Sequence, residues 1–262
     1  MKTVKAKLIT KEKLEELYVR QRKTQDEIGK LYGVTGSAIL YWRRVYNINS
    51  LKKSRDILLE PTSSLAYILG VLRGDGFIYI NKITNCHFVL LSVIDRAFAQ
   101  QFFNALINIG LSPKWIWLKP QQKNWSPQVK VYVESKQFVK WYKSMTLKIE
   151  SSIINSFPLD FLRGMYDSEG SINWESKQLF TLGMVTTNKR TKYLVNSVLI
   201  NQGFANVKKR ERVLPSGKIA YDILLYRTYD IQKFLCLVQP SVKILPRSEN
   251  TLIPCQANQG IG

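Results

Sequence analysis

Histidine and cysteine are scarce in this sequence of 262 residues. His87 is the single histidine, so a nuclease metal bound by several histidines is excluded. The three cysteines, Cys86, Cys236 and Cys255, lie far apart, without the paired spacing of a zinc site or a disulfide framework. Their scatter predicts free thiols in a reducing compartment.

Long apolar runs are also absent. The apolar stretches are far shorter than a membrane span, and no signal-peptide pattern precedes Lys11. We therefore expect no membrane partner and no secretion, and a location in the cytoplasm of a prokaryote, associated with the nucleoid, or in an organelle. The 45% of hydrophobic residues still allows a sizeable core, in one large domain or about two to three small ones.

Acidic residues are outnumbered two to one. The chain has 39 Lys and Arg against 19 Asp and Glu, which gives a net charge of +20. An excess of this size, spread along a folded chain, indicates a polyanionic partner, and nucleic acid is the first choice. A ribosomal or general RNA-coating protein is the plainer alternative. A membrane surface is less favoured, because no lysine-rich amphipathic helix stands out.

The first fifty residues have the pattern of short helices around a turn. Thr24 and Glu27 have the spacing of a capping box, and Gly33 is placed to end the helix that they begin. Thr35 can cap the next helix. With a helix expected over residues 11–21, this segment resembles a helix-turn-helix domain, whose second helix enters a major groove. The alternative is an ordinary three-helix packing module.

The second of these helices has an apolar side and a polar side. Ile39, Trp42 and Val45 recur every three residues along it. The DNA-contact candidates on this helix are Ser37, Tyr41, Arg43 and Arg44.

The rest of the chain contains an internal repeat. The segment ILGVLRGDGFI, residues 68–78, matches LRGMYDSEGSI, residues 162–172, in its third, eighth and ninth positions, which are Gly, an acid and Gly. Asp75 thus matches Glu169, 94 positions later. Ser92 and Thr186 each follow their acid by 17 residues, at the end of an apolar strand. Each copy is expected to fold as helix-strand-strand-helix-strand-strand-helix.

The two matched helices carry small residues at a spacing of four. These are Ala66, Gly70 and Gly74 in the first copy, and Gly164 and Ser168 in the second. Small residues at this spacing remove the ridge of side chains, so two helix backbones can approach closely. If the copies pack about a pseudo-twofold axis, Ala66, Gly70 and Gly164 form the seam, and the two acids emerge side by side.

An acid at the end of a helix is unusual, because the last carbonyls already carry partial negative charge. A divalent cation removes the conflict, since Mg²⁺ prefers carboxylate, carbonyl and water oxygens. The sequence therefore predicts Asp75 and Glu169 as metal ligands. A metal beside a basic surface suggests hydrolysis of phosphodiester bonds.

These residues resemble the LAGLIDADG homing endonuclease family in its single-chain form with two motifs. ILGVLRGDG and LRGMYDSEG match its nine-residue pattern at the glycine, the acid and the final glycine, and the resemblance extends over residues 64–247. It implies an α+β fold, a duplicated αββαββα unit whose two antiparallel sheets form a saddle over DNA, and a monomer.

The resemblance also implies roles for single residues. Asp75 and Glu169 would bind Mg²⁺, or another divalent cation such as Mn²⁺, and support cleavage, with the carbonyls of Gly74 and Ser168 as further contacts. Lys189 and Lys243 are candidates for the basic residue that polarises the attacking water or the phosphate.

Strand alternation supplies the remaining candidates for DNA contacts. Such a ladder of residues can follow a phosphate backbone or read guanine edges. The candidates are Lys130 and Tyr132 in the first copy and Lys208, Arg210, Arg212 and Lys218, in a hairpin turn, in the second. Trp115 and Trp117 share a face and are expected in the core rather than as a stacking platform.

The function implied is that of an intron-encoded or free-standing homing endonuclease, which cuts a long asymmetric DNA target with divalent metal. An RNA maturase that binds its host intron and an inactive DNA-binding regulator are the alternatives. The expected organisation is a helix-turn-helix domain at residues 1–50, a linker at 51–63, repeats at 64–150 and 151–254, and a tail at 255–262.

Overall fold

A computed structural model describes residues 9–21, 23–48, 57–120, 126–175 and 178–242. The chain divides into two units, residues 1–56 and 57–262, which are treated separately below. Within the described ranges, no helix is long and apolar enough to cross a membrane.

The N-terminal unit is helical. Its elements are α1 (Lys11–Glu15), the π-helical turn η1 (Glu16–Arg20), α2 (Gln25–Tyr32) and α3 (Gly36–Val45). The predicted capping box is present, since the Thr24 hydroxyl accepts from the Glu27 N–H at 3.2 Å and the Glu27 carboxylate accepts from the Thr24 N–H at 2.7 Å. Gly33 ends α2 with a φ of 67°, and Thr35 caps α3.

The turn between α2 and α3 is tight. A Cβ atom on Gly29 would lie 2.6 Å from the Val34 carbonyl oxygen, so only glycine lets the two segments approach this closely. Ile28 and Ile39 are fully buried between the helices, as the apolar spacing predicts.

The second unit contains the predicted element order twice. The first copy comprises α4 (Ser63–Arg73), β1 (Phe77–Asn81), β2 (Cys86–Val93), α5 (Arg96–Asn108), β3 (Lys114–Leu118), β4 (Gln128–Glu134) and α6 (Lys136–Ser144). The second comprises α8 (Pro158–Glu169), β5 (Gly170–Glu175), β6 (Gln178–Thr186), α9 (Lys189–Asn201), β7 (Lys208–Val213), β8 (Ile219–Leu225) and α10 (Thr228–Val238). The predicted fold class, a duplicated αββαββα unit after an all-α region, is confirmed.

One helix is additional. α7 (Leu147–Ser156) follows the first copy, and the expected border between residues 150 and 151 falls inside it. Thr146 caps α7, and Pro158 begins α8 directly after it. The two copies are therefore joined by a helix.

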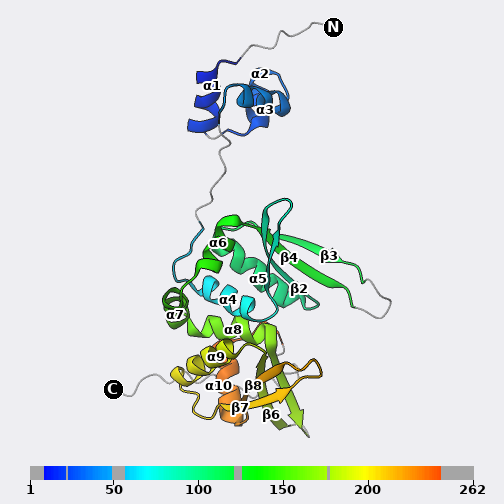
Figure 1. Ribbon diagram of the computed structural model, residues 1–262, viewed down its shortest axis with the longest axis vertical. Coiled ribbons are helices and arrows are strands. Elements are labelled where there is room, and N and C mark those ends of the chain that lie inside the picture. The colour runs from blue at the N-terminus through cyan, green and yellow to red at the C-terminus, as the bar shows by residue number, and fades with distance from the viewer. Residues whose placement is uncertain (1–8, 22, 49–56, 121–125, 176–177, 243–262) are drawn as a thin grey trace. The chain divides into compact units, whose positions relative to one another are not determined.

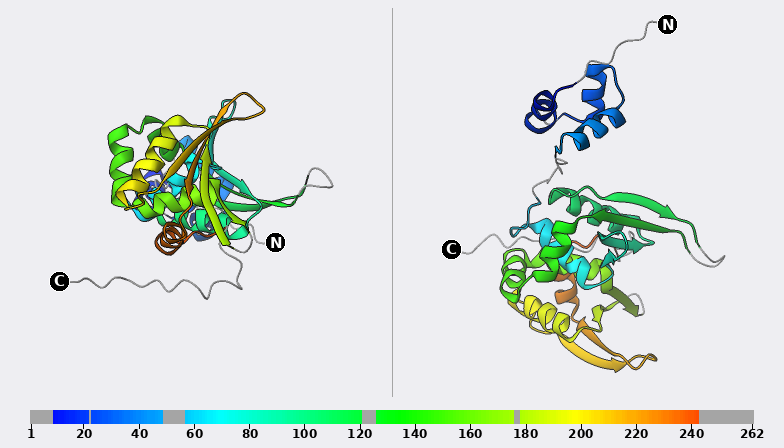
Figure 2. Two further views of the ribbon diagram at one scale, coloured as in Figure 1. Left: turned by 90° about the horizontal axis from the view of Figure 1, so that it is seen from below. Right: turned by 45° about the horizontal axis from the view of Figure 1, so that its top comes forward.

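Each copy forms one antiparallel sheet of four strands, in the orders β1-β2-β4-β3 and β5-β6-β8-β7. Helices cover one face of each sheet, while the other face, here called the outer face, carries no helix (Figures 1 and 2). Strand alternation follows this division. Val89, Leu91, Val129 and Val131 are buried toward the helices, whereas Tyr79 and Lys130 lie on the outer face.

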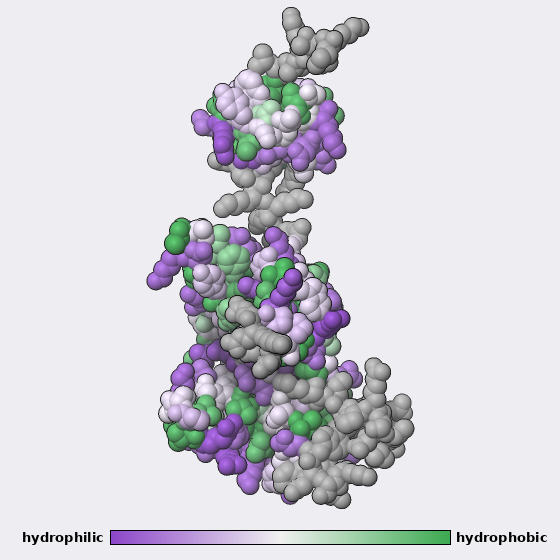
Figure 3. All heavy atoms as spheres, turned by 90° about the vertical axis from the view of Figure 1, so that its right-hand side faces the viewer, coloured by the Kyte–Doolittle hydropathy of each residue, from purple (hydrophilic) through white to green (hydrophobic). Residues whose placement is uncertain are grey.

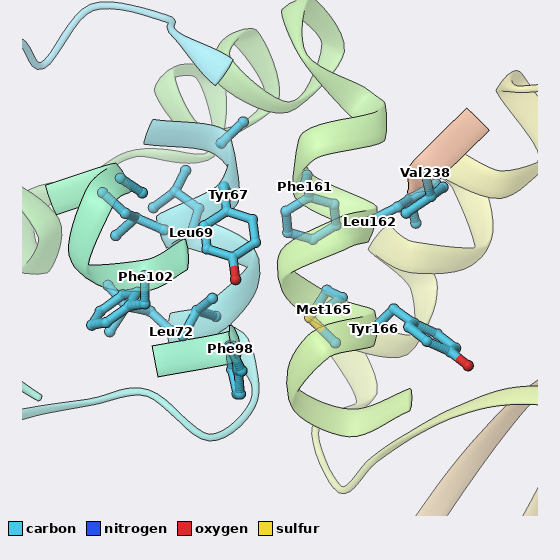
Figure 4. Packing of buried hydrophobic residues seen from close by; sticks show 14 of the residues in the cluster. Tyr67, Leu69, Leu72, Phe98, Phe102, Phe161, Leu162, Met165, Tyr166 and Val238 are labelled. Atoms are coloured by element: carbon cyan, nitrogen blue, oxygen red, sulfur yellow. The ribbon is translucent and has the colours of Figure 1, made fainter. Parts of the chain in front are cut away.

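The two copies meet along α4 and α8, which lie side by side (Figures 1 and 4). The backbones touch at Gly70 and Gly164. A Cβ atom on Gly164 would lie 2.9 Å from the Val71 nitrogen and 3.1 Å from the Gly70 Cα, and closer still to the Tyr67 carbonyl oxygen. The seam is sealed by buried side chains such as Phe161 and Met165 (Figure 4).

Two buried carboxylates also link the copies. Asp167 in α8 accepts a hydrogen bond from the Tyr67 hydroxyl in α4 at 2.9 Å and from the Ser241 N–H at 2.8 Å. Glu150 in α7 forms ion pairs with Arg73 in α4 and Arg190 in α9. The Glu150 side chain is only 3% exposed, so its negative charge must be balanced by these two arginines.

Changing Glu150 to glutamine should lower the free energy of unfolding of the second unit by about 3 kcal/mol, because Arg73 would lose its buried counter-charge. Urea unfolding followed by tryptophan fluorescence measures this, in a Trp42→Phe background that removes the tryptophan of the N-terminal unit. Asp160→Asn is the control, because the 3.6 Å pair of Asp160 with Arg163 is more exposed. Equal losses in the two variants would contradict a special role for Glu150.

Three further details of the second unit differ from the sequence-based expectations. Ser92 and Thr186 are not equivalent. The β5–β6 hairpin is one residue shorter than the β1–β2 hairpin, so Val185 of β6 occupies the ladder position that Ser92 has in β2. Cys236 is disulfide-bonded, contrary to the expectation of free thiols, while Cys86 is free. Trp115 packs against the core as expected, but Trp117 is 52% exposed beneath the Arg96 guanidinium.

Candidate metal centre and nucleic-acid interface

The two motif acids lie at the same end of the helix seam. α4 ends at Arg73, so Asp75 occupies the turn after the helix, whereas Glu169 is the last residue of α8. A Cβ atom on Gly74 would lie 2.9 Å from the Cγ of Glu169 and 3.0 Å from the Ser168 hydroxyl. Gly74 therefore lets the turn that carries Asp75 lie directly against the end of α8.

A cavity of about 320 Å³ opens beside Asp75. Its polar lining comes from both copies and from segments far apart in the sequence. These residues are Asp75, Ser92, Asp95, Gln128, Asp167 and Ser168. No sequence pattern marks Gln128 as a site residue, because it lies 53 positions from Asp75 and reaches the cavity through the pairing of β4 with β2. Its place at the start of an alternating strand was the one available signal.

Two of the three aspartates in this lining have structural roles. Asp95 caps α5 by accepting from the Phe98 N–H at 3.0 Å. Asp167 is held by Tyr67 and Ser241, and its burial raises its pKa above the ordinary value of an aspartate. Asp75 is thus the aspartate of this lining that occupies the motif position at the end of the seam.

The oxygen atoms at the end of the seam suit a magnesium ion. Among the described residues, no group of three or more His, Cys, Asp or Glu side chains is placed to hold a metal. Mg²⁺ does not need such a group, since it keeps several waters and is commonly held by one or two carboxylates together with substrate phosphates. The donor set of Asp75, Glu169 and neighbouring carbonyls fits this requirement.

The two basic candidates for catalysis are not brought to the cavity. Lys189 begins α9, is exposed, and is not part of the cavity lining found in the described ranges. Lys243 lies outside the described residues. Both therefore stay predictions.

The outer face of the β5–β8 sheet is basic. Lys208, Arg210 and Arg212 are exposed on one side of β7, as the alternation predicts, and Lys218 is exposed in the following turn. The Nε of Arg212 donates to both carboxylate oxygens of Asp222, at 3.1 and 3.2 Å. This pair holds Arg212 against the sheet, while Lys208 and Arg210 extend the positive surface.

The outer face of the β1–β4 sheet is partly aromatic. Lys130 and Tyr132 both lie on it, and the Lys130 Nζ is 5.7 Å from the centre of the Tyr132 ring. Tyr132 neighbours Phe88, which in turn neighbours Tyr79. On the face of the molecule drawn in Figure 3, hydrophilic areas alternate with smaller hydrophobic ones.

In the N-terminal unit, one side of α3 is exposed. Ser37, Tyr41 and Arg44 are spaced by four and three residues and share that side. Arg43 is a correction, because its guanidinium lies over the Tyr18 ring and donates to the Tyr18 hydroxyl at 2.7 Å. Arg43 is half-buried and packs the unit internally, so it does not belong to the exposed side.

The fold defined by these elements is a duplicated αββαββα unit with its acids at the helix seam. Residues 156–239 match the family model of the LAGLIDADG-like domain. This match lies in the second copy, so residues 156–239 are similar to a LAGLIDADG-like domain, and the resemblance stated from the motifs is confirmed.

Curated relatives match part of the chain. Two uncharacterized proteins of Methanocaldococcus jannaschii are each 34% identical to 56% of this chain. The matched regions cover 56% and 52% of those proteins, so the chain spans about half the length of the curated relatives it matches.

One solved structure supports the fold. The N-terminal LAGLIDADG domain of DUF199/WhiA superposes with a TM-score of 0.51 at 15% identity, over 78% of this chain and 89% of that one. The endonuclease I-DmoI in complex with DNA and Mn gives a TM-score of 0.44 at 19% identity, over 67% of this chain and 96% of that one.

Proposed function

We propose that this protein is a metal-dependent, site-specific DNA endonuclease. The observation that carries the proposal is the placement of Asp75 and Glu169 at one end of the glycine seam between the two copies. Two carboxylates at this end of the seam supply oxygen ligands of the kind that a divalent cation prefers. The net charge of +20 and the exposed arginines and lysines of β7 supply the partner surface for a double-stranded DNA target.

Asp75 and Glu169 would hold Mg²⁺ or Mn²⁺, with the carbonyl groups of Gly74 and Ser168 as further contacts. The bound ion would stabilise charge on the scissile phosphate and acidify a water molecule. Lys208 and Arg210 neutralise phosphates and orient the duplex. The Ser92 hydroxyl and the Gln128 amide line the cavity beside Asp75, where they can donate to a phosphate oxygen or position the attacking water.

Cleavage of a randomised DNA library with and without Mg²⁺ tests the proposal. We expect recurrent cutting at one long sequence, which disappears with EDTA and in the Asp75→Asn/Glu169→Gln double variant. Tight DNA binding without any cleavage would reject the endonuclease and leave the inactive regulator of the same fold. Selective binding of an intron RNA without DNA cleavage would instead indicate the maturase.

Deleting residues 1–56 should weaken DNA binding while leaving metal-dependent cleavage intact at high protein concentration. The reason is that the exposed side of α3 adds contacts to DNA, whereas the acids belong to the other unit. Titrating the truncated protein against its target measures both effects. Tyr41→Ala/Arg44→Ala in the full chain is the finer comparison, and Gln25→Ala on α2 is its control. A truncated protein that never cuts would contradict this modular organisation.

A further inference from the structure

The first edge strand of each sheet carries different chemistry on its outer face. In β1, Phe77 and Tyr79 lie on this face and are 49% and 50% exposed, while Ile78 between them packs against the core. When the two motif acids are aligned, the equivalent residues of β5 are Ser171 and Asn173, which are exposed and polar. The first copy thus exposes two aromatic rings where the second copy exposes small polar side chains.

The other edge strand differs in the same sense. In β3, Ile116 is 38% exposed and Leu118 is half-buried on the outer face. Counting across the paired strands, the equivalent residues of β7 are Arg210 and Arg212, which are both exposed. Because the two copies share one strand pairing, the fold does not require apolar side chains at these edges. Exposed apolar side chains grouped in this way indicate a binding surface.

Thymine is the base that an apolar edge can recognise in a duplex. The phosphates attract lysine and arginine, whereas the C5-methyl group of thymine is the apolar group that a base pair presents in the major groove. Contact with this methyl group removes apolar surface from water and needs no hydrogen bond. The Tyr79 ring is held in place for such a contact, since its centre lies 6.3 Å from that of the Phe88 ring, with 21° between the planes. Lys114 and Lys130 on the same face remain suited to the phosphates.

Guanine is the base that suits Arg212 on the outer face of the second sheet. The Nε of Arg212 donates to both carboxylate oxygens of Asp222, and the Arg212 side chain is still 44% exposed. Because these hydrogen bonds use Nε, the far edge of the guanidinium, with its two terminal nitrogens, can meet a pair of acceptors. The O6 and N7 atoms of guanine are such a pair in the major groove. Leu118, at the equivalent position of the first copy, has no donor to offer.

We propose that the two halves of the DNA target differ in base composition, and that the outer faces read this difference. Phe77, Tyr79 and Ile116 contact thymine methyl groups in one half. Arg212, oriented by Asp222, donates to a guanine in the other half. This inference rests on the duplex target of the proposed function, but it concerns recognition and does not depend on cleavage.

The test begins with selection of the preferred target by the full chain in EDTA from a randomised duplex library. Single bases of the selected duplex are then replaced and its affinity is measured again. Deoxyuridine in place of thymine removes only the methyl group, and should weaken binding by about threefold to fourfold at each contacted thymine of one half. 7-Deazaguanine in place of guanine removes the N7 acceptor, and should weaken binding by about 10-fold at the contacted guanine of the other half.

Variants that exchange residues between the copies assign each effect to its face. Phe77→Ser/Tyr79→Asn gives the first copy the residues of the second, and should abolish the loss caused by deoxyuridine while keeping the loss caused by 7-deazaguanine. Arg212→Leu should do the reverse. Each variant thereby shows through the effect that it retains that its other face is still folded. Ile107→Ala, 48% exposed on α5, is the matched control and should keep both losses.

The proposal would be overturned if deoxyuridine weakened binding equally in both halves, or if Phe77→Ser/Tyr79→Asn left that loss unchanged. A loss from 7-deazaguanine that persists in Arg212→Leu would also overturn it, as would duplex binding without any base preference. So would a dimer of the wild-type chain in sedimentation that Phe77→Ser/Tyr79→Asn converts to monomers. A selected target with the expected asymmetry that the protein never cuts with Mg²⁺ would support this inference and reject only the endonuclease.

Discussion

Changing Gly164 to alanine is expected to lower the free energy of unfolding of the second unit by about 3 kcal/mol or more. The added Cβ would lie 2.9 Å from the Val71 nitrogen and closer to the Tyr67 carbonyl oxygen, and both are backbone atoms of α4. Neither can rotate away, so the two helices must separate. Separation would open the core around Phe161 and Met165 and would move Asp75 away from Glu169.

Urea unfolding of Gly164→Ala, followed as for Glu150→Gln, measures this loss. Gly183→Ala is the control, because its Cβ would meet the flexible end of the Leu224 side chain at 2.8 Å, with the nearest backbone atom at 3.8 Å. We expect Gly183→Ala to change the stability by less than about 1 kcal/mol. If Gly164→Ala is as stable as this control, the close packing of α4 and α8 is not what holds the copies together.

The features predicted correctly from the sequence are those set by local or repeated patterns. The cap residues Thr24 and Thr35 act within three positions of themselves, so their spacing alone predicts the helix starts. The internal repeat supplied the long-range information, since two copies of one motif make Asp75 and Glu169 equivalent before any contact is known. The glycines of the seam followed from the same comparison.

The features that the sequence did not reveal depend on non-local register. Ser92 and Thr186 stand at equal distances from their acids, yet one residue fewer in the β5–β6 hairpin changes which side chains face outward. Gln128 enters the cavity only because β4 pairs with β2. Arg43 has the charge expected of a DNA contact. It donates instead to the hydroxyl of Tyr18, which lies 25 positions earlier. No periodicity marks such pairs.

Asp75→Asn and Glu169→Gln, made singly, are expected to lower double-strand cleavage by at least about 100-fold each, with DNA binding retained. Each change removes a negative charge that holds the cation but keeps nearly the same shape, so the helix seam and the outer faces should persist. Cleavage is measured on a plasmid that carries the selected target, and binding on the same target in Ca²⁺, which shares the oxygen ligands of Mg²⁺. Loss of binding in both variants would contradict their assignment as metal ligands.

The two halves of the site should also cleave their strands at different rates, because the residues beside the two acids differ in polarity. Ser92 and Gln128 lie beside Asp75, whereas the strand ladders give Val185 and Ala220 at the equivalent positions of the second copy. An apolar pair cannot donate to a phosphate or hold a water. We therefore expect the wild-type protein to accumulate a nicked plasmid, one strand being cut before the other.

Gln128→Ala should reduce that difference by slowing the faster strand about 10-fold to 100-fold, since it removes one positioned donor of this half. Gln100→Ala, on the exposed side of α5, is the matched control and should leave the nicked fraction unchanged. Labelling each strand of the target separately shows which rate changes. If Gln128→Ala slows cleavage of both strands equally, Gln128 contributes to the DNA interface as a whole. The difference between the two copies then does not affect the cleavage rates.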